Sequence, residues 1–124
     1  MNNPFNIIQD LHAEEYHELD QSRDLNDRIK TIIESGDIVL FMKGNAQMPQ
    51  CGFSANTIKM LETCQKKYKT FNILMSEDIR QGLKTYSNWP TFPQLYVKGK
   101  LIGGNDIISE LFEEGELQKM LNDL

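Results

Sequence analysis

The chain has 124 residues, with 13 Lys and Arg against 18 Asp and Glu, and a formal net charge of −5. This length fits one domain of about 100–150 residues, and the acidic balance argues against nucleic-acid binding, which needs clustered basic residues. No apolar run approaches the roughly 18–20 residues that cross a bilayer, so no membrane association is expected. The first residues lack a secretory or mitochondrial targeting pattern. We therefore predict a cytoplasmic protein whose two cysteines are free thiols.

Residues 1–22 form an acidic segment with few apolar anchors, and we predict an N-terminal extension ahead of one domain at 23–124. A short helix and a disordered segment are the alternatives for this extension. The spacing of His12, Glu15 and His17 would allow a metal site, but solvated charge is the better interpretation.

The domain is predicted to begin with a helix and a buried strand. The helix is capped by Asp24 or Ser22, carries apolar residues at helical spacing and ends at Gly36. The continuous apolar run at 37–42 has the length of a strand and is bounded by glycines, which is typical of a central strand buried on both faces.

A lone thiol follows this strand at the end of a loop, residues 43–50. From Ser54 to Tyr68, apolar residues recur at three- and four-residue steps, which predicts a helix directly after Cys51. Cys64 lies on the apolar side of this helix and about 20 Å along it from Cys51, too far to form a disulfide with it. We interpret Cys64 as a small buried residue.

The rest of the chain alternates strands and helices. The predicted elements are a strand at 70–74, a helix from Ser76 to about Tyr86, a proline-bracketed break at 88–93, an antiparallel hairpin of 94–97 with 101–102, and a last helical region divided at Gly115. A strand–helix–strand order implies a right-handed parallel crossover, so the sheet is predicted to be mixed.

Cys51 is the candidate reactive residue. Ser54 occupies the position that a second cysteine takes in a Cys-X-X-Cys redox motif, so Cys51 needs sulfur from another molecule. Its place before a helix N-terminus and the nearby charge of Lys43 both favour a thiolate. An inert buried thiol is the alternative.

Four separated motifs resemble the monothiol glutaredoxins of the CGFS class. They are Phe-Met-Lys-Gly at 41–44, Pro-Gln-Cys-Gly-Phe-Ser at 49–54, the block from 78 to 95 with Trp-Pro-Thr-Phe-Pro-Gln-Leu, and Gly-Gly-Asn-Asp-Ile at 103–107. The resemblance runs from about residue 24 to the C-terminus. It implies an α/β, thioredoxin-like glutaredoxin fold with a central four-stranded mixed sheet flanked by helices.

The chain departs from this family pattern at two places. Asn45-Ala46 stands where the family usually has Thr or Ser followed by Pro, which puts the rigidity of the loop in question. Asn105 stands where Cys or Ser is common, which affects the details of ligand contact.

The ligand that the resemblance implies is glutathione. Two cations would hold its glycyl carboxylate, the backbone before a cis proline would pair with the tripeptide, and a helix N-terminus with an aspartate would bind the γ-glutamyl end. Singly, these residues are also explained as solvated charges or a helix cap. The implied binding residues are Lys43, Arg80, Thr91, Phe92, Pro93, Gly104, Asn105 and Asp106.

The number of available sulfurs gives the functional hypothesis. A [2Fe–2S] cluster takes four thiolates, and a homodimer supplies two as Cys51, so the other two can come from two glutathiones. The resemblance implies such a cluster, carriage to apo iron–sulfur proteins, a role in iron homeostasis and a BolA-type partner in heterodimers. A glutathione-dependent thiol–disulfide oxidoreductase using Cys51 alone is the alternative. A structural adaptor is the third hypothesis.

Overall fold

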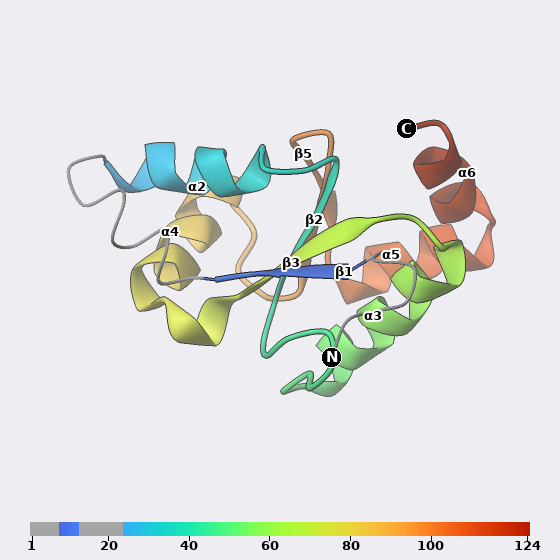
Figure 1. Ribbon diagram of the computed structural model, residues 1–124, viewed down its shortest axis with the longest axis horizontal. Coiled ribbons are helices and arrows are strands. Elements are labelled where there is room, and N and C mark those ends of the chain that lie inside the picture. Colours follow the sequence, from blue (N-terminus) through green and yellow to red (C-terminus); the bar gives the residue numbers. More distant parts are fainter. Residues whose placement is uncertain (1–7, 13–23) are drawn as a thin grey trace.

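The computed structural model of the chain describes residues 8–12 and 24–124. Its centre is a five-stranded sheet in the order β1-β3-β2-β4-β5, with helices on both faces (Figure 1). The strands are β1 Ile8–Leu11, β2 Ile38–Met42, β3 Tyr68–Asn72, β4 Gln94–Val97 and β5 Lys100–Gly103. The helices are α2 Leu25–Ile33, α3 Gly52–Cys64, α4 Glu77–Ser87, α5 Asn105–Glu113 and α6 Glu116–Asn122, with a 3₁₀ turn at Ile73–Met75.

The predicted mixed sheet is confirmed. β2 and β3 run parallel and are connected through α3, whereas β4 is antiparallel to both β2 and β5. The hairpin forms where the sequence predicts it, and Gly115 divides the last helical region with a left-handed backbone at φ 77°. Among the described residues, no helix is long and apolar enough to span a membrane.

The sheet has five strands, and the prediction of four is wrong. β1 lies within the predicted N-terminal extension and pairs with β3 in parallel, with Ile8 opposite Tyr68 and Leu11 opposite Phe71. The Thr70 hydroxyl also donates a hydrogen bond to the Asp10 carboxylate. Four residues are too few to show an alternation of apolar and polar side chains, so the sequence does not reveal this strand, and it forms by pairing with β3. Residues 8–11 are therefore neither helical nor disordered, as the two alternatives had it. Residues 13–23, which include Glu15 and His17 of the considered metal site, lie outside the described residues.

The helix after Cys51 is shorter than its apolar spacing indicates. It ends at Cys64 because Gln65 takes the left-handed conformation, with φ 57°. Tyr68 therefore begins β3 and is not part of the helix, and β3 ends at Asn72 before the 3₁₀ turn. Tyr68 still packs among the same buried residues as Cys64, because the strand returns beneath the helix.

Two apolar cores lie on the two faces of the sheet. β2 is buried along its whole length, and its residues alternate, so that Leu40 faces one core and Phe41 the other. α3, α5 and α6 cover the first face, and α2 and α4 cover the second (Figure 1). This arrangement fixes the end of β2, and with it the loop that leads to Cys51.

Candidate functional site

Cys51 is the N-cap residue of α3. Its backbone is extended, and its sulfur accepts a hydrogen bond from the Ser54 N–H at 3.4 Å. The same sulfur lies 3.3 Å from the Ser54 hydroxyl, and this hydroxyl accepts a bond from the Lys43 N–H, also at 3.3 Å. Ser54 is fully buried. The serine that replaces a second cysteine therefore serves as a fixed partner of the sulfur.

The environment of Cys51 favours its thiolate. Partial burial raises the pKa of the thiol, but hydrogen bonds from the hydroxyl and N–H of Ser54 and from the Phe53 N–H outweigh it, together with the charge of Lys43. The resulting pKa lies below the usual value for cysteine. The direction agrees with the sequence prediction, and the α3 N-terminus supplies part of it.

We expect Ser54→Ala to raise the pKa of Cys51, because the donor that stabilises the thiolate is removed. Both chains carry Cys64→Ala, so that Cys51 is the thiol measured. The rate of alkylation of Cys51 by iodoacetamide should be lower with Ser54→Ala near neutral pH. The two rates should be equal at a pH above the Cys51 pKa of either chain. Ser35→Ala is the control, since that hydroxyl lies in the turn after α2 and donates to the Ile32 carbonyl. An unchanged pH profile for Ser54→Ala would contradict the assigned cause.

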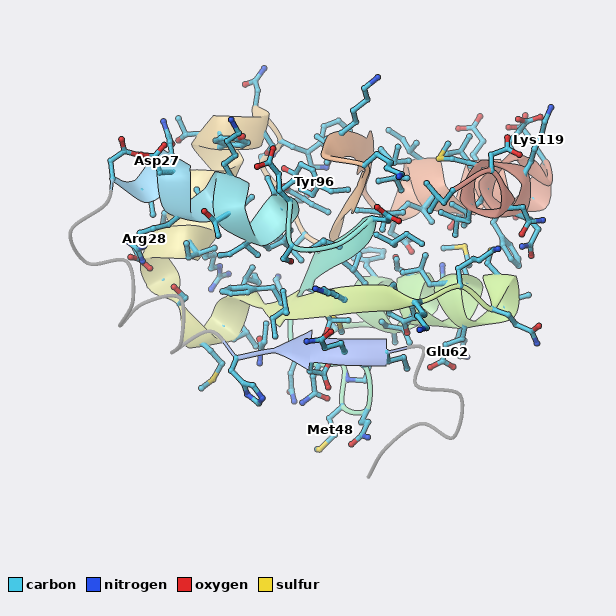
Figure 2. The ribbon with its side chains drawn as sticks, turned by 45° about the horizontal axis from the view of Figure 1, so that its top comes forward. Asp27, Arg28, Met48, Glu62, Tyr96 and Lys119 are labelled. Atoms are coloured by element: carbon cyan, nitrogen blue, oxygen red, sulfur yellow. The ribbon has the colours of Figure 1, made fainter. Side chains whose placement is uncertain are left out.

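The tip of the loop before Cys51 is held by Asn45. Its side-chain oxygen accepts hydrogen bonds from the N–H groups of Gln47 at 3.1 Å and Met48 at 2.8 Å. Met48 projects away from the fold and is 67% exposed (Figure 2). Asn45 thus closes the turn with its own side chain, so the departure from the family pattern does not leave the loop open.

The base of the loop is closed by backbone contacts. Gly44 forms an antiparallel bridge with Pro49, and the Gln50 N–H donates to the Lys43 carbonyl at 2.8 Å. Asn72, at the end of β3, accepts a hydrogen bond from the Gly44 N–H at 3.0 Å. These contacts attach the loop to two strand ends and place Lys43 beside Cys51.

A cavity of ≈400 Å³ lies at this end of the sheet. This volume is in the range of small-molecule sites. Seven of the eight predicted glutathione residues line it, and Pro93 does not. Pro93 follows a cis peptide bond from Phe92, as predicted. The lining residues are Lys43, Phe53, Arg80, Lys84, Trp89, Pro90, Thr91, Phe92, Gly104, Asn105, Asp106 and Ile107.

The sequence prediction missed five of these lining residues: Phe53, Lys84, Trp89, Pro90 and Ile107. Lys84 follows Arg80 by four residues on α4, so its position on the same helix face could have been inferred. No such period marks Trp89, which the turn before β4 brings to the cavity. Phe53, Pro90 and Ile107 lie within the quoted motifs, but the expected roles were given only to their neighbours.

Polar groups in the cavity wall lack partners within the described part of the chain. Nε of Arg80 and Nε1 of Trp89 are buried there without a hydrogen bond. Gly104 occupies the N-cap of α5 and has no side chain to cap the first N–H groups of that helix. The cavity thus presents two cations on α4, Lys43 and a helix N-terminus, which together favour an anionic ligand.

The turn at 89–93 is fixed by hydrogen bonds from the buried side-chain amide of Gln94. Gln94 is completely buried on β4, and its Nε2 donates hydrogen bonds to the carbonyls of Trp89 at 3.0 Å and Thr91 at 3.3 Å. The Tyr96 hydroxyl donates to Oε1 of Gln94 at 3.1 Å. The backbone that lines the cavity is therefore fixed by the sheet.

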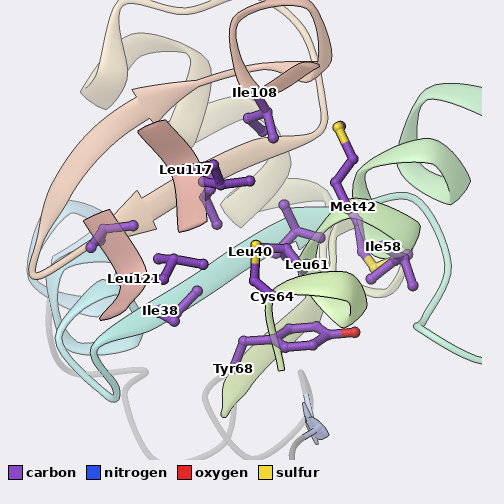
Figure 3. Close-up of a cluster of buried hydrophobic side chains, with 13 residues drawn as sticks. Ile38, Leu40, Met42, Ile58, Leu61, Cys64, Tyr68, Ile108, Leu117 and Leu121 are labelled. Carbon is purple, nitrogen blue, oxygen red and sulfur yellow. The ribbon is translucent and has the colours of Figure 1, made fainter. Parts of the chain in front are cut away.

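Cys64 lies in the core, away from this site. It is 3% exposed and packs among Leu40, Leu61, Tyr68 and Leu117 (Figure 3). Burial raises the pKa of its thiol. Its prediction as a buried structural thiol is confirmed, and Cys51 is the one cysteine of the chain that is partly exposed.

Known proteins share both the sequence and the fold. A family model described as Glutaredoxin matches residues 38–102. Human Glutaredoxin-3 is 50% identical over 119 residues, 93% of this chain and 35% of that protein. The probable monothiol glutaredoxin GrlA of Legionella pneumophila is 56% identical over 85 residues, 68% of this chain and 96% of that protein. The solution structure of reduced poplar apo GrxS14 is 44% identical, with a TM-score of 0.70 over 80% of this chain and 91% of that one.

The chain belongs to the glutaredoxin family, and its fold is the thioredoxin-like fold of that family. It is a monothiol glutaredoxin with Cys-Gly-Phe-Ser at 51–54, and it matches monothiol glutaredoxins at about 50% identity. Glutaredoxins are a glutathione-binding family. The chain spans about a third of the length of human Glutaredoxin-3.

Proposed function

We propose that this chain binds glutathione in the cavity, which Lys43 and Phe53 line although Cys51 itself does not, and carries a [2Fe–2S] cluster as cargo, held between two chains. The observation that supports this proposal most directly is a single thiol with a lowered pKa, partly exposed at a helix N-terminus. Such a thiol is a fitting metal ligand, because metals bind the thiolate form.

The count of sulfurs sets the stoichiometry. The chain has two cysteines, and Cys64 is buried in the apolar core. A cluster of this type takes four thiolates, so two copies of Cys51 require two further sulfurs. Two bound glutathiones supply these sulfurs in the proposal. Because half of the ligands are then exchangeable small molecules, the cluster would be transferable, which suits a carrier.

Charges around the cavity support a glutathione with its sulfur toward Cys51. Lys43, Arg80 and Lys84 would attract the glycyl carboxylate, and the free N–H groups at the start of α5 would bind the γ-glutamyl carboxylate. Asp106, in the first turn of α5, would take the γ-glutamyl amine. Apart from that of Lys84, which the motifs did not indicate, each role is the one expected from the family motifs.

The proposed partners follow from the same need for outside ligands. A second copy of the chain would complete the cluster site in a homodimer, and a BolA-type protein would replace one copy in a heterodimer. Apo iron–sulfur proteins would receive the cluster, which links the chain to iron homeostasis.

The lowered pKa of Cys51 also favours a second candidate, a glutathione-dependent thiol–disulfide oxidoreductase. In its first step the Cys51 thiolate attacks the glutathione sulfur of a mixed disulfide and releases the substrate as a thiolate. In the second step a glutathione thiolate attacks the Cys51–glutathione disulfide, which gives oxidised glutathione and restores the Cys51 thiolate. No other cysteine is needed.

One experiment separates the two functions. The chain is incubated anaerobically with iron, sulfide and glutathione, and its visible spectrum and size are recorded before and after the glutathione is removed. We expect a coloured dimer that forms only with glutathione present, and slow reduction of a glutathionylated peptide. A colourless monomer that reduces this peptide rapidly would overturn the carrier function in favour of the oxidoreductase.

A further inference from the structure

Asn105 lines the cavity, yet its side chain is directed at the helix of Cys51. Its Oδ1 accepts a hydrogen bond from Asn56 Nδ2 at 2.9 Å and from the Thr57 hydroxyl at 3.3 Å. Both donors come from α3, whereas Asn105 is the first residue of α5. Asn105 therefore joins two helices whose N-termini both face the site.

The Thr57 hydroxyl extends this connection to the first turn of α3. Thr57 is fully buried, and its one hydroxyl hydrogen is shared between Oδ1 of Asn105 and the Phe53 carbonyl oxygen, which lies 3.0 Å from the hydroxyl oxygen. Asn56 reaches further along α5, with Nδ2 at 3.4 Å from the Ser109 hydroxyl. One set of side chains thus joins the turn that follows Cys51 to the first turns of α5.

The two donors on α3, Asn56 and Thr57, do not line the cavity themselves. Of the described residues, the cavity lining includes Phe53 and Asn105 but neither Asn56 nor Thr57. The oxygen of the Asn105 side chain already accepts two hydrogen bonds from α3. What α5 offers a ligand at this point is its backbone N–H groups, because Gly104 leaves them uncapped.

We propose that Asn56 and Thr57, acting through Asn105, are positioning residues that set the α5 N-terminus at the correct distance from Cys51 for the γ-glutamyl end of glutathione. The inference rests on the proposed glutathione site. It gives the Asn at 105 a role that differs from direct ligand contact.

The test compares three ligands that share the central cysteine. Reduced glutathione, γ-glutamylcysteine and cysteinylglycine are titrated into the reduced chain, and Kd is taken from backbone amide shifts in NMR spectra. Thr57→Val removes the hydroxyl at nearly constant volume. Asn56→Ala removes the other donor. Because Asn56 is exposed, this variant still tests the proposal if Thr57→Val, a change at a buried position, prevents folding.

We expect each variant to bind glutathione and γ-glutamylcysteine about fivefold more weakly, the effect of about one neutral hydrogen bond. Binding of cysteinylglycine, which lacks the γ-glutamyl group, should change by less than about twofold. The control is Thr63→Val, because the Thr63 hydroxyl bonds the Lys59 carbonyl on the same helix without reaching α5.

Two outcomes would overturn the inference alone: wild-type affinities in both variants, or an equal loss for all three ligands, which would indicate a general structural role. A wild-type chain whose amide shifts do not respond to glutathione would overturn the proposed function as well. The ligand series therefore distinguishes failure of the positioning role from failure of the site.

Discussion

Replacing Cys51 by serine is expected to abolish both the colour of the reconstituted protein and its dimerisation. The two losses should occur together, because the proposed cluster is what joins the chains and Cys51 is the sulfur that each chain contributes. After anaerobic reconstitution with glutathione, Cys51→Ser should remain colourless, with no iron bound above background, and elute as a 14.4 kDa monomer. Visible absorbance, iron analysis and size-exclusion chromatography measure these effects.

The matched control for this change is Cys64→Ala. Cys64 is 3% exposed, and burial raises the pKa of its thiol, so it is a poor metal ligand. Its replacement should leave colour and dimerisation intact and cost about 1–2 kcal/mol of unfolding free energy through lost packing. Loss of the cluster in Cys64→Ala, or its retention in Cys51→Ser, would contradict the proposed ligand set.

Gly44→Ala should destabilise the chain by about 2–4 kcal/mol, the cost of a strained backbone plus a steric conflict. Gly44 has φ +89°, and a Cβ placed there would lie 2.4 Å from the Met48 carbonyl oxygen and 2.7 Å from the Gln50 nitrogen. The loop would have to open, which would break its bridge to Pro49. Chemical denaturation measures the loss, and alkylation of Cys51 shows whether its environment changes too.

Gly99→Ala separates the two contributions to this loss. Gly99 has a similar backbone, φ +79°, but a Cβ there would meet nothing within 4 Å. It should therefore show only the conformational cost, about 1 kcal/mol, and leave the reactivity of Cys51 unchanged. Equal destabilisation by the two changes would mean that the loop accommodates the methyl group, which would contradict the closed geometry of the loop.

Much of the fold could be predicted from local patterns. The β2 strand is a continuous apolar run, and α2 shows a helical apolar stripe with Asp24 as its cap, whose side chain accepts a hydrogen bond from the Asp27 N–H. These features are visible without a partner because they depend on neighbours in sequence. The errors lie where local patterns are ambiguous. Tyr68 fits the helical spacing of α3, and only the left-handed Gln65 shows that the helix has ended.

The candidate site was predicted more completely than its surroundings. Motif residues such as Lys43, Arg80 and Asp106 line one cavity, as expected from strand ends that meet at the same edge. The residues that support them were not predicted. Gln94 reads as an ordinary strand residue, and its buried amide acquires a role only when the turn at 89–93 folds over it.

The sequence by itself determined the chemistry of this protein: one thiol, a serine in place of a second, and the motifs of a monothiol glutaredoxin. These are properties of residue types and spacing. Only the tertiary structure decided that β1 joins the sheet, that Trp89 faces the cavity, and that Asn105 is bonded to α3. Each depends on contacts between segments far apart in the chain, for which no local period exists, so folding alone brings the partners together.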